Sequence, residues 1–164
     1  MWWHDDPNRF LAEYQMLKRN YPRAKFTHGL KTSRFCTACS CFSLETQEHI
    51  AIFAEVITPL GCSYPVVVVY PCDFPHQIPS AWPLSALKPS PPSHQFRDGR
   101  LCLTDNENDR TVTGCMVLSW AYGWLTCYDI WKKTGKLREQ FMMPAPQRQL
   151  SMPTSSFTIR PIHP

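Results

Sequence analysis

Two residue types that can carry out acyl transfer lie eight positions apart in the segment that ends at Leu103. Cys102 supplies a thiol, His94 supplies an imidazole, and Gly99 lies between them. A thiolate attacks an activated carbonyl to form a thioester, and a neighbouring imidazole assists such covalent chemistry. The segment is too interrupted for a helix, so we expect an irregular flap that holds the histidine near the cysteine.

Basic side chains near Cys102 bear on the reactivity of its thiol. Arg97 and Arg100 lie within five residues of it. Positive charge favours the thiolate, so these guanidinium groups should lower the thiol pKa modestly from ~8.5. Lys88 would add to this effect if it lies near the flap. We therefore interpret Cys102 as an acyl carrier.

The role of His94 and of the nearby acids is left open by the residues themselves. The imidazole could donate a hydrogen bond to a tetrahedral oxyanion or act as a base on the incoming nucleophile, and these roles require different protonation states. Carboxylates at Asp98, Asp105, Glu107 and Asp109 could position an amine acceptor. Acids in a polar loop are, however, usually just solvated.

Two helices are predicted to frame the region that contains the flap. Asp6-Pro7 is typical of an N-cap followed by proline, and apolar residues then recur at helical spacing, which predicts a helix over 7–20. A tryptophan-rich apolar stripe predicts a second helix over 114–133. Lys132 and Lys133 complement the negative end of this helix, and Gly135 is its expected cap.

Strands are predicted between the two helices. The ranges 34–42 and 48–57 alternate as strands do and are expected to form a hairpin. Four valines at 66–69 begin a third strand, over 66–70, that should be buried on both faces of a sheet. A proline-dense run over 79–92 then leads to the flap. The expected class is α+β, with an N-terminal helix, an antiparallel meander, an active-site flap and a C-terminal helix.

The 164 residues suffice for one folded domain, which we place at residues 1–143. Residues 144–164 lack periodicity and are expected to form a Pro/Ser-rich tail that is extended, pinned against the domain or disordered. The formal charge of +4 is scattered, so nucleic-acid binding is not predicted. No stretch approaches the ~18 apolar residues of a membrane span. The start lacks the pattern of a signal peptide, so we expect a cytoplasmic protein.

Eight cysteines could suggest disulfides or a zinc site. With no signal peptide, a reducing compartment and free thiols are expected. Cys36 and Cys39 form a CxxC pair, and Cys62 and Cys72 could complete four ligands, but no second pair follows at the usual spacing. The alternation around Cys39 fits a strand. We therefore predict structural cysteines without metal, and no cofactor.

The order of these elements, with several short motifs, resembles the ubiquitin-conjugating fold over residues 7–140. Tyr64-Pro65 is similar to the pair that closes the meander in that family, and Gly99 to Leu103 is similar to its Gly-x-x-Cys-Leu active-site turn. Eukaryotic members carry asparagine where this chain has His94. That departure, with Trp124-Leu125 and the run Tyr128 to Gly135, resembles the bacterial ubiquitin-conjugating-like proteins.

Among the bacterial branches, the chain most resembles the stand-alone conjugating-like proteins of type II CBASS anti-phage systems. That resemblance implies a protein partner, a cGAS-like cyclic-nucleotide synthase whose C-terminus becomes linked through the conjugating cysteine. Neither GxGxxG nor a P-loop occurs in the sequence, so ATP-dependent activation of the carboxylate is not expected of this chain. Two alternatives remain open: a cysteine hydrolase, and a catalytically silent binding module of the same fold.

Overall fold

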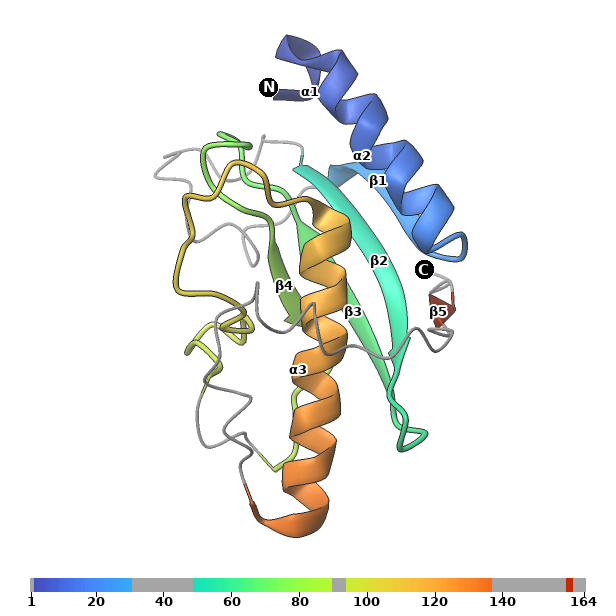
Figure 1. The fold of residues 1–164 in the computed structure, drawn as a ribbon, viewed down its shortest axis with the longest axis vertical. Coiled ribbons are helices and arrows are strands. Elements are labelled where there is room, and N and C mark those ends of the chain that lie inside the picture. The colour runs from blue at the N-terminus through green and yellow to red at the C-terminus, as the bar shows by residue number, and fades with distance from the viewer. Residues whose placement is uncertain (1, 31–48, 90–93, 137–158, 161–164) are drawn as a thin grey trace.

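The computed structural model describes residues 2–30, 49–89, 94–136 and 159–160. Within these ranges it is an α+β structure, as expected. Its elements are α1 (Trp2–Asp5), α2 (Pro7–Asn20), β1 (Lys25–Leu30), β2 (His49–Ile57), β3 (Ser63–Val69), β4 (Ser80–Pro83), α3 (Gly114–Thr134) and β5 (Ile159–Arg160). The antiparallel sheet has the order β1-β2-β3-β4, and α3 crosses one of its faces (Figure 1). None of the helices described is long and apolar enough to cross a membrane.

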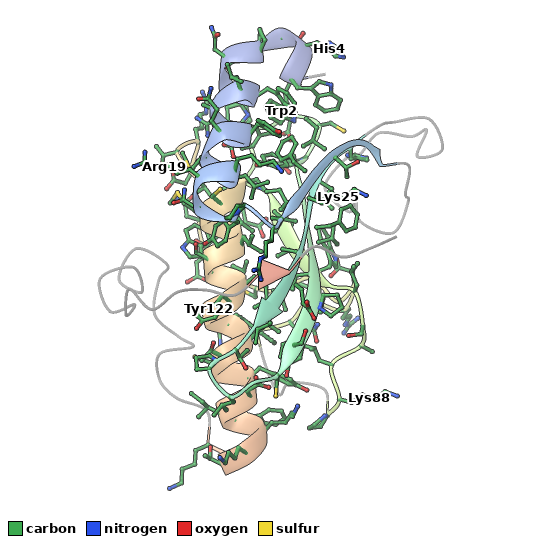
Figure 2. The ribbon with its side chains drawn as sticks, turned by 90° about the vertical axis from the view of Figure 1, so that its right-hand side faces the viewer. Trp2, His4, Arg19, Lys25, Lys88 and Tyr122 are labelled. Atoms are coloured by element: carbon green, nitrogen blue, oxygen red, sulfur yellow. The ribbon has the colours of Figure 1, made fainter. Side chains whose placement is uncertain are left out.

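Helix α2 begins where local capping chemistry predicts. The Asp6 side chain accepts a hydrogen bond from the N–H of Arg9 at 2.9 Å, and proline occupies the first turn. The predicted helix over 7–20 is thus confirmed at both ends. The short helix α1 was not predicted. Its Trp2 is buried, with its ring centroid 4.6 Å from that of Phe74, at the end of the molecule where α2 lies (Figure 2).

Helix α3 is also confirmed, one residue longer than predicted. The Thr113 side chain accepts a hydrogen bond from the N–H of Met116, and Gly135 ends the helix in the left-handed region at φ 67°. The N–H of Gly135 donates to the carbonyl of Trp131 at 2.7 Å. The tryptophan stripe packs in the core, as expected. Both ends of α3 are therefore set by local capping contacts.

The valine run of β3 is buried on both faces of the sheet, as predicted. Val66 and Val68 join the main core under α3, whereas Val67 and Val69 join a smaller cluster with Trp82. Successive residues of a strand point to opposite faces, so two apolar clusters require a continuous apolar run.

Three strands of the structure were not predicted from the sequence. The strand that pairs with the first half of β2 is β1, which was not predicted because it contains Gly29 and little alternation. The strand predicted over 34–42 lies outside the described residues. β4 was not predicted because it lies in the proline-dense run. It is the strand at one end of the sheet, where proline is tolerated. In the predicted tail, β5 pairs with Glu55 and Val56 of β2, so the tail is pinned there.

A buried carboxylate joins α2, α3 and the end of β3. One oxygen of Glu13 accepts hydrogen bonds from the hydroxyl of Tyr70 at 2.7 Å and from the N–H of Gly114 at 3.0 Å. The other oxygen lies 3.3 Å from Nε of Arg9. The side chain is almost fully buried. Burial raises the pKa of Glu13, and the hydrogen bonds and Arg9 oppose this only in part.

This raised pKa predicts a specific dependence of stability on pH. The folded chain holds the proton of Glu13 at pH values where the unfolded chain has lost it, so the free energy of unfolding falls as pH rises through that interval. Glu13→Gln keeps an oxygen that accepts hydrogen bonds and has no proton to lose. We expect the variant to lose this part of the pH dependence, measured by urea unfolding between pH 4 and 7. An identical slope in both proteins would contradict the prediction.

Candidate functional site

The predicted flap is a short hairpin. The N–H of Phe96 donates to the carbonyl of Arg100 at 2.8 Å, and the N–H of Cys102 donates to the carbonyl of His94 at 2.9 Å. Gly99 makes the turn with φ 88°, a left-handed conformation that glycine adopts without strain. His94 and Cys102 are therefore cross-strand partners. The structure brings the two predicted site residues together.

The hairpin has one inner and one outer face. Leu101 is buried, and its N–H donates to the carbonyl of Ala81 on β4, which ties the flap to that edge of the sheet. The Arg100 guanidinium lies 4.1 Å from the Phe96 ring centroid, so these opposed residues share the other face. Alternation along the strands places Cys102 on the same face as Arg100. Its side chain is partly exposed.

Two side chains of helix α3 donate hydrogen bonds to the backbone at the start of the flap and just before it. The indole N–H of Trp124 donates to the carbonyl of His94 at 3.0 Å, and the Tyr128 hydroxyl donates to the carbonyl of Pro89 at 2.7 Å. His94 itself adopts φ 61°, which non-glycine residues rarely do. Sequence reasoning missed these contacts, because each joins positions at least 30 residues apart.

The three basic residues considered for Cys102 differ in their contacts and in their exposure to solvent. The Arg100 guanidinium lies 3.1 Å from the carboxylate of Glu107 and therefore forms an ion pair with that acid. Arg97 is exposed and lines an open hollow of about 630 Å³ beside the hairpin turn. Lys88 is exposed at an end of the molecule, and its side chain points outward (Figure 2).

The nearby acids have mainly structural contacts. Asp98 accepts a hydrogen bond from the N–H of Arg100, and Asp109 accepts from the backbone and hydroxyl of Thr111. These Thr111 hydrogen bonds hold the pKa of Asp109 below its usual value. Asp105 is exposed. Acceptor positioning by this loop therefore gains no support from the geometry.

Other cysteines of the described residues are less suited to the chemistry. Cys115 is buried, and burial raises the pKa of its thiol to about 12. The sulfur of Cys72 lies 3.9 Å from Nδ1 of His49, so these two side chains form a thiol–imidazole contact. That imidazole is buried, which lowers its pKa and keeps it from a macromolecular substrate. Cys102 is the thiol that combines partial exposure with a histidine on an outer flap.

A metal site is not formed by the described residues, which contain no group of three potential ligands. Cys36 and Cys39 lie outside these ranges, so their prediction as metal-free strand residues stays a prediction. The Tyr-Pro motif has a structural contact instead. The hydroxyl of Tyr64 donates to the buried carboxylate of Asp129 on α3, which also accepts from Thr58. Two of the short motifs used in the sequence comparison thus meet in the core.

Comparison with protein families identifies the family of the chain. The family model of the type II CBASS E2 protein matches residues 15–141, which include α3, the flap and part of α2. The chain belongs to the type II CBASS E2 family. Membership gives it a role in CBASS anti-phage defence, within the theme of ubiquitin-like conjugation, with protein partners from such systems. No curated protein and no solved structure matched the chain.

The sequence resemblance to this family is therefore confirmed. The match covers the whole hairpin from His94 to Cys102 and ends seven residues after the last residue of α3, Thr134. β5 lies beyond the matched residues. The part of the chain that carries the candidate site is the part shared with other CBASS E2 proteins.

Proposed function

We propose that this CBASS E2 protein carries an acyl group as a thioester on Cys102 and transfers it to an acceptor. The acyl group comes from the C-terminus of a partner protein, and a cGAS-like cyclic-nucleotide synthase is the proposed partner. The observation that carries the proposal is the pairing of Cys102 with His94 on the outer face of a hairpin anchored to α3. We propose residues 1–143 as the conjugating domain.

The proposed reaction has two steps. The thiolate of Cys102 attacks the carbonyl of a donor C-terminus that is already activated, a C–S bond forms, and the activating group leaves with its electron pair. An acceptor nucleophile then attacks the thioester, loses its proton, and releases the Cys102 thiolate. The proposed reaction starts from a donor that is already activated, because neither GxGxxG nor a P-loop occurs in this sequence.

The proposal is tested by the adduct on the wild-type chain. The chain is co-expressed with the proteins encoded beside it, and the products are separated under non-reducing conditions. A band that disappears on thiol treatment, with mass spectrometry that joins a partner C-terminus to Cys102, supports acyl transfer. Hydrolysis of the donor without any transfer would favour the cysteine hydrolase instead. A Cys102 that never reacts would favour the binding module.

His94 should affect transfer more than folding. Loss of one oxyanion donor typically lowers rates about a hundredfold or more. We therefore expect His94→Ala to slow formation or discharge of the Cys102 adduct by about that factor. His94→Asn should recover part of the rate, because its amide donates a hydrogen bond and asparagine tolerates the left-handed backbone at this position. The measurements are single-turnover adduct kinetics.

Thermal unfolding of the same variants provides the control. Ala is less favourable than Asn in the left-handed region, so a modest loss of stability in His94→Ala is expected, and none in His94→Asn. If both variants lose stability while the adduct kinetics stay unchanged, His94 is a structural residue and Cys102 alone carries the chemistry.

A further inference from the structure

Two hydrogen bonds from α3 hold the chain at Pro89, before the flap, and at His94, where the flap hairpin begins. The Tyr128 hydroxyl donates to the carbonyl of Pro89, and the Trp124 indole donates to the carbonyl of His94. Trp124 and Tyr128 lie one helical turn apart, are almost fully buried, and stack with ring centroids 5.9 Å apart and planes at 16°. Each ring therefore keeps the other in place for its hydrogen bond.

One carbonyl oxygen links this aromatic pair to the candidate nucleophile. The carbonyl of His94 accepts from the indole of Trp124 at 3.0 Å and from the backbone N–H of Cys102 at 2.9 Å. A carbonyl has two lone pairs, so both of its acceptor positions are used. The helix, the histidine and the cysteine are thus joined through a single atom.

The backbone of His94 needs such support. Its φ of 61° lies in the left-handed region, where residues with a Cβ persist only when the surrounding structure holds them. With the indole hydrogen bond removed, the carbonyl keeps only the flap strand as a donor. The peptide can then relax to negative φ, which changes the direction in which the His94 side chain leaves the hairpin.

We propose that Trp124 and Tyr128 are positioning residues that hold the flap in the conformation that pairs His94 with Cys102. These contacts order the flap in the protein before any donor or acceptor binds. The consequence for transfer rests on the proposed function of Cys102. The tryptophan acts directly on the His94 carbonyl, and the tyrosine anchors the approach at Pro89.

The test compares two tryptophan variants of the full chain. Trp124→Phe removes an indole N–H that donates to the flap. Trp120→Phe makes the same truncation on the same helix at a site that is also buried, but the Trp120 indole N–H has no hydrogen-bond partner among the described residues. Any loss of stability from the smaller ring should therefore occur in both variants.

The flap is followed by hydrogen exchange of the Cys102 amide and by alkylation of the Cys102 thiol, each measured by peptide mass spectrometry. We expect Trp124→Phe to accelerate amide exchange about tenfold relative to Trp120→Phe, as loss of a well-formed hydrogen bond predicts. Thiol alkylation should change in the same variant alone. Adduct formation should slow by about tenfold or more, because misplaced catalytic groups lose rate steeply.

A tyrosine pair gives a second, independent comparison. Tyr128→Phe removes the hydroxyl that binds the Pro89 carbonyl, whereas Tyr122→Phe makes the same truncation at another position of the same helix. Tyr122 is partly exposed and lies about halfway along α3 (Figure 2). We expect faster exchange at the flap in Tyr128→Phe and wild-type exchange in Tyr122→Phe.

The backbone argument is tested by a double variant. Asparagine adopts the left-handed conformation more readily than most residues. Trp124→Phe should therefore accelerate Cys102 exchange less in a His94→Asn background than in the wild-type background. Equal exchange and alkylation in Trp124→Phe and Trp120→Phe would overturn the proposal, even if Cys102 forms the adduct. A chain that never forms an adduct would refute the proposed function, while the exchange data would still decide whether α3 orders the flap.

Discussion

Replacing Cys102 by alanine is expected to abolish the thiol-labile adduct completely. The half-buried sulfur lies on the outer face of the flap hairpin, opposite His94, and alanine leaves no nucleophile there. Removal of a covalent nucleophile typically lowers rates by a factor of about a thousand or far more. The measurement is the amount of adduct in cells that express the complete system, quantified under non-reducing conditions. A thiol-labile adduct on Cys102→Ala would show that another residue is the nucleophile.

Two further variants make this result specific. Cys102→Ser replaces the thiol by a hydroxyl, which can form an oxygen ester that resists thiol exchange, so an adduct stable to reductant and cleaved by hydroxylamine is expected. Cys62→Ala is the matched control, since Cys62 is a free, half-buried cysteine between β2 and β3 and outside the flap. It should form the wild-type amount of adduct.

The largest expected loss of stability follows from Gly114→Ala. A Cβ at Gly114 would lie 2.1 Å from the hydroxyl oxygen of Tyr70 and 2.7 Å from Cδ1 of Ile52. Neither side chain can withdraw easily, because both are almost fully buried and the Tyr70 hydroxyl donates to Glu13. Overpacking of this kind costs about 3 kcal/mol. For a chain of this size that corresponds to roughly 6–12 °C in melting temperature.

Gly61→Ala separates this overpacking from the general cost of replacing glycine. Gly61 has φ 79° in the turn between β2 and β3, and a Cβ added at this position would have no atom within 4 Å. Its substitution should therefore cost only backbone strain, on the order of 1 kcal/mol. Thermal unfolding of both variants, followed by circular dichroism, makes the comparison. A Gly114→Ala protein as stable as Gly61→Ala would mean that the Tyr70 and Glu13 network yields at little cost.

Local sequence determined the helices and the buried strand. Asp6, Pro7 and Gly135 set helix ends through hydrogen bonds and backbone angles that involve only a few neighbouring residues, so their effects are visible in the sequence. Successive side chains of any strand point to opposite faces of the sheet, so an unbroken run of valines predicts that both faces are buried. The offset between His94 and Cys102 likewise corresponds to a cross-strand pair, since a glycine turn lies between them.

Sheet partners and side-chain hydrogen bonds were decided by the tertiary structure. β1 pairs with β2 although apolar and polar residues alternate little along β1. Strand pairing depends on which backbone segment lies beside the free edge of β2 in the folded chain. The use of Arg100 to bind Glu107, the Glu13 network at Gly114, and the hydrogen bond from Trp124 to the His94 carbonyl all join residues that are distant in the sequence or lie in different loops. The contacts of Glu13 and Trp124 satisfy polar groups that are buried once the chain has packed. The sequence by itself therefore determined which residues could do the chemistry, and the packing against α3 decided how they are held.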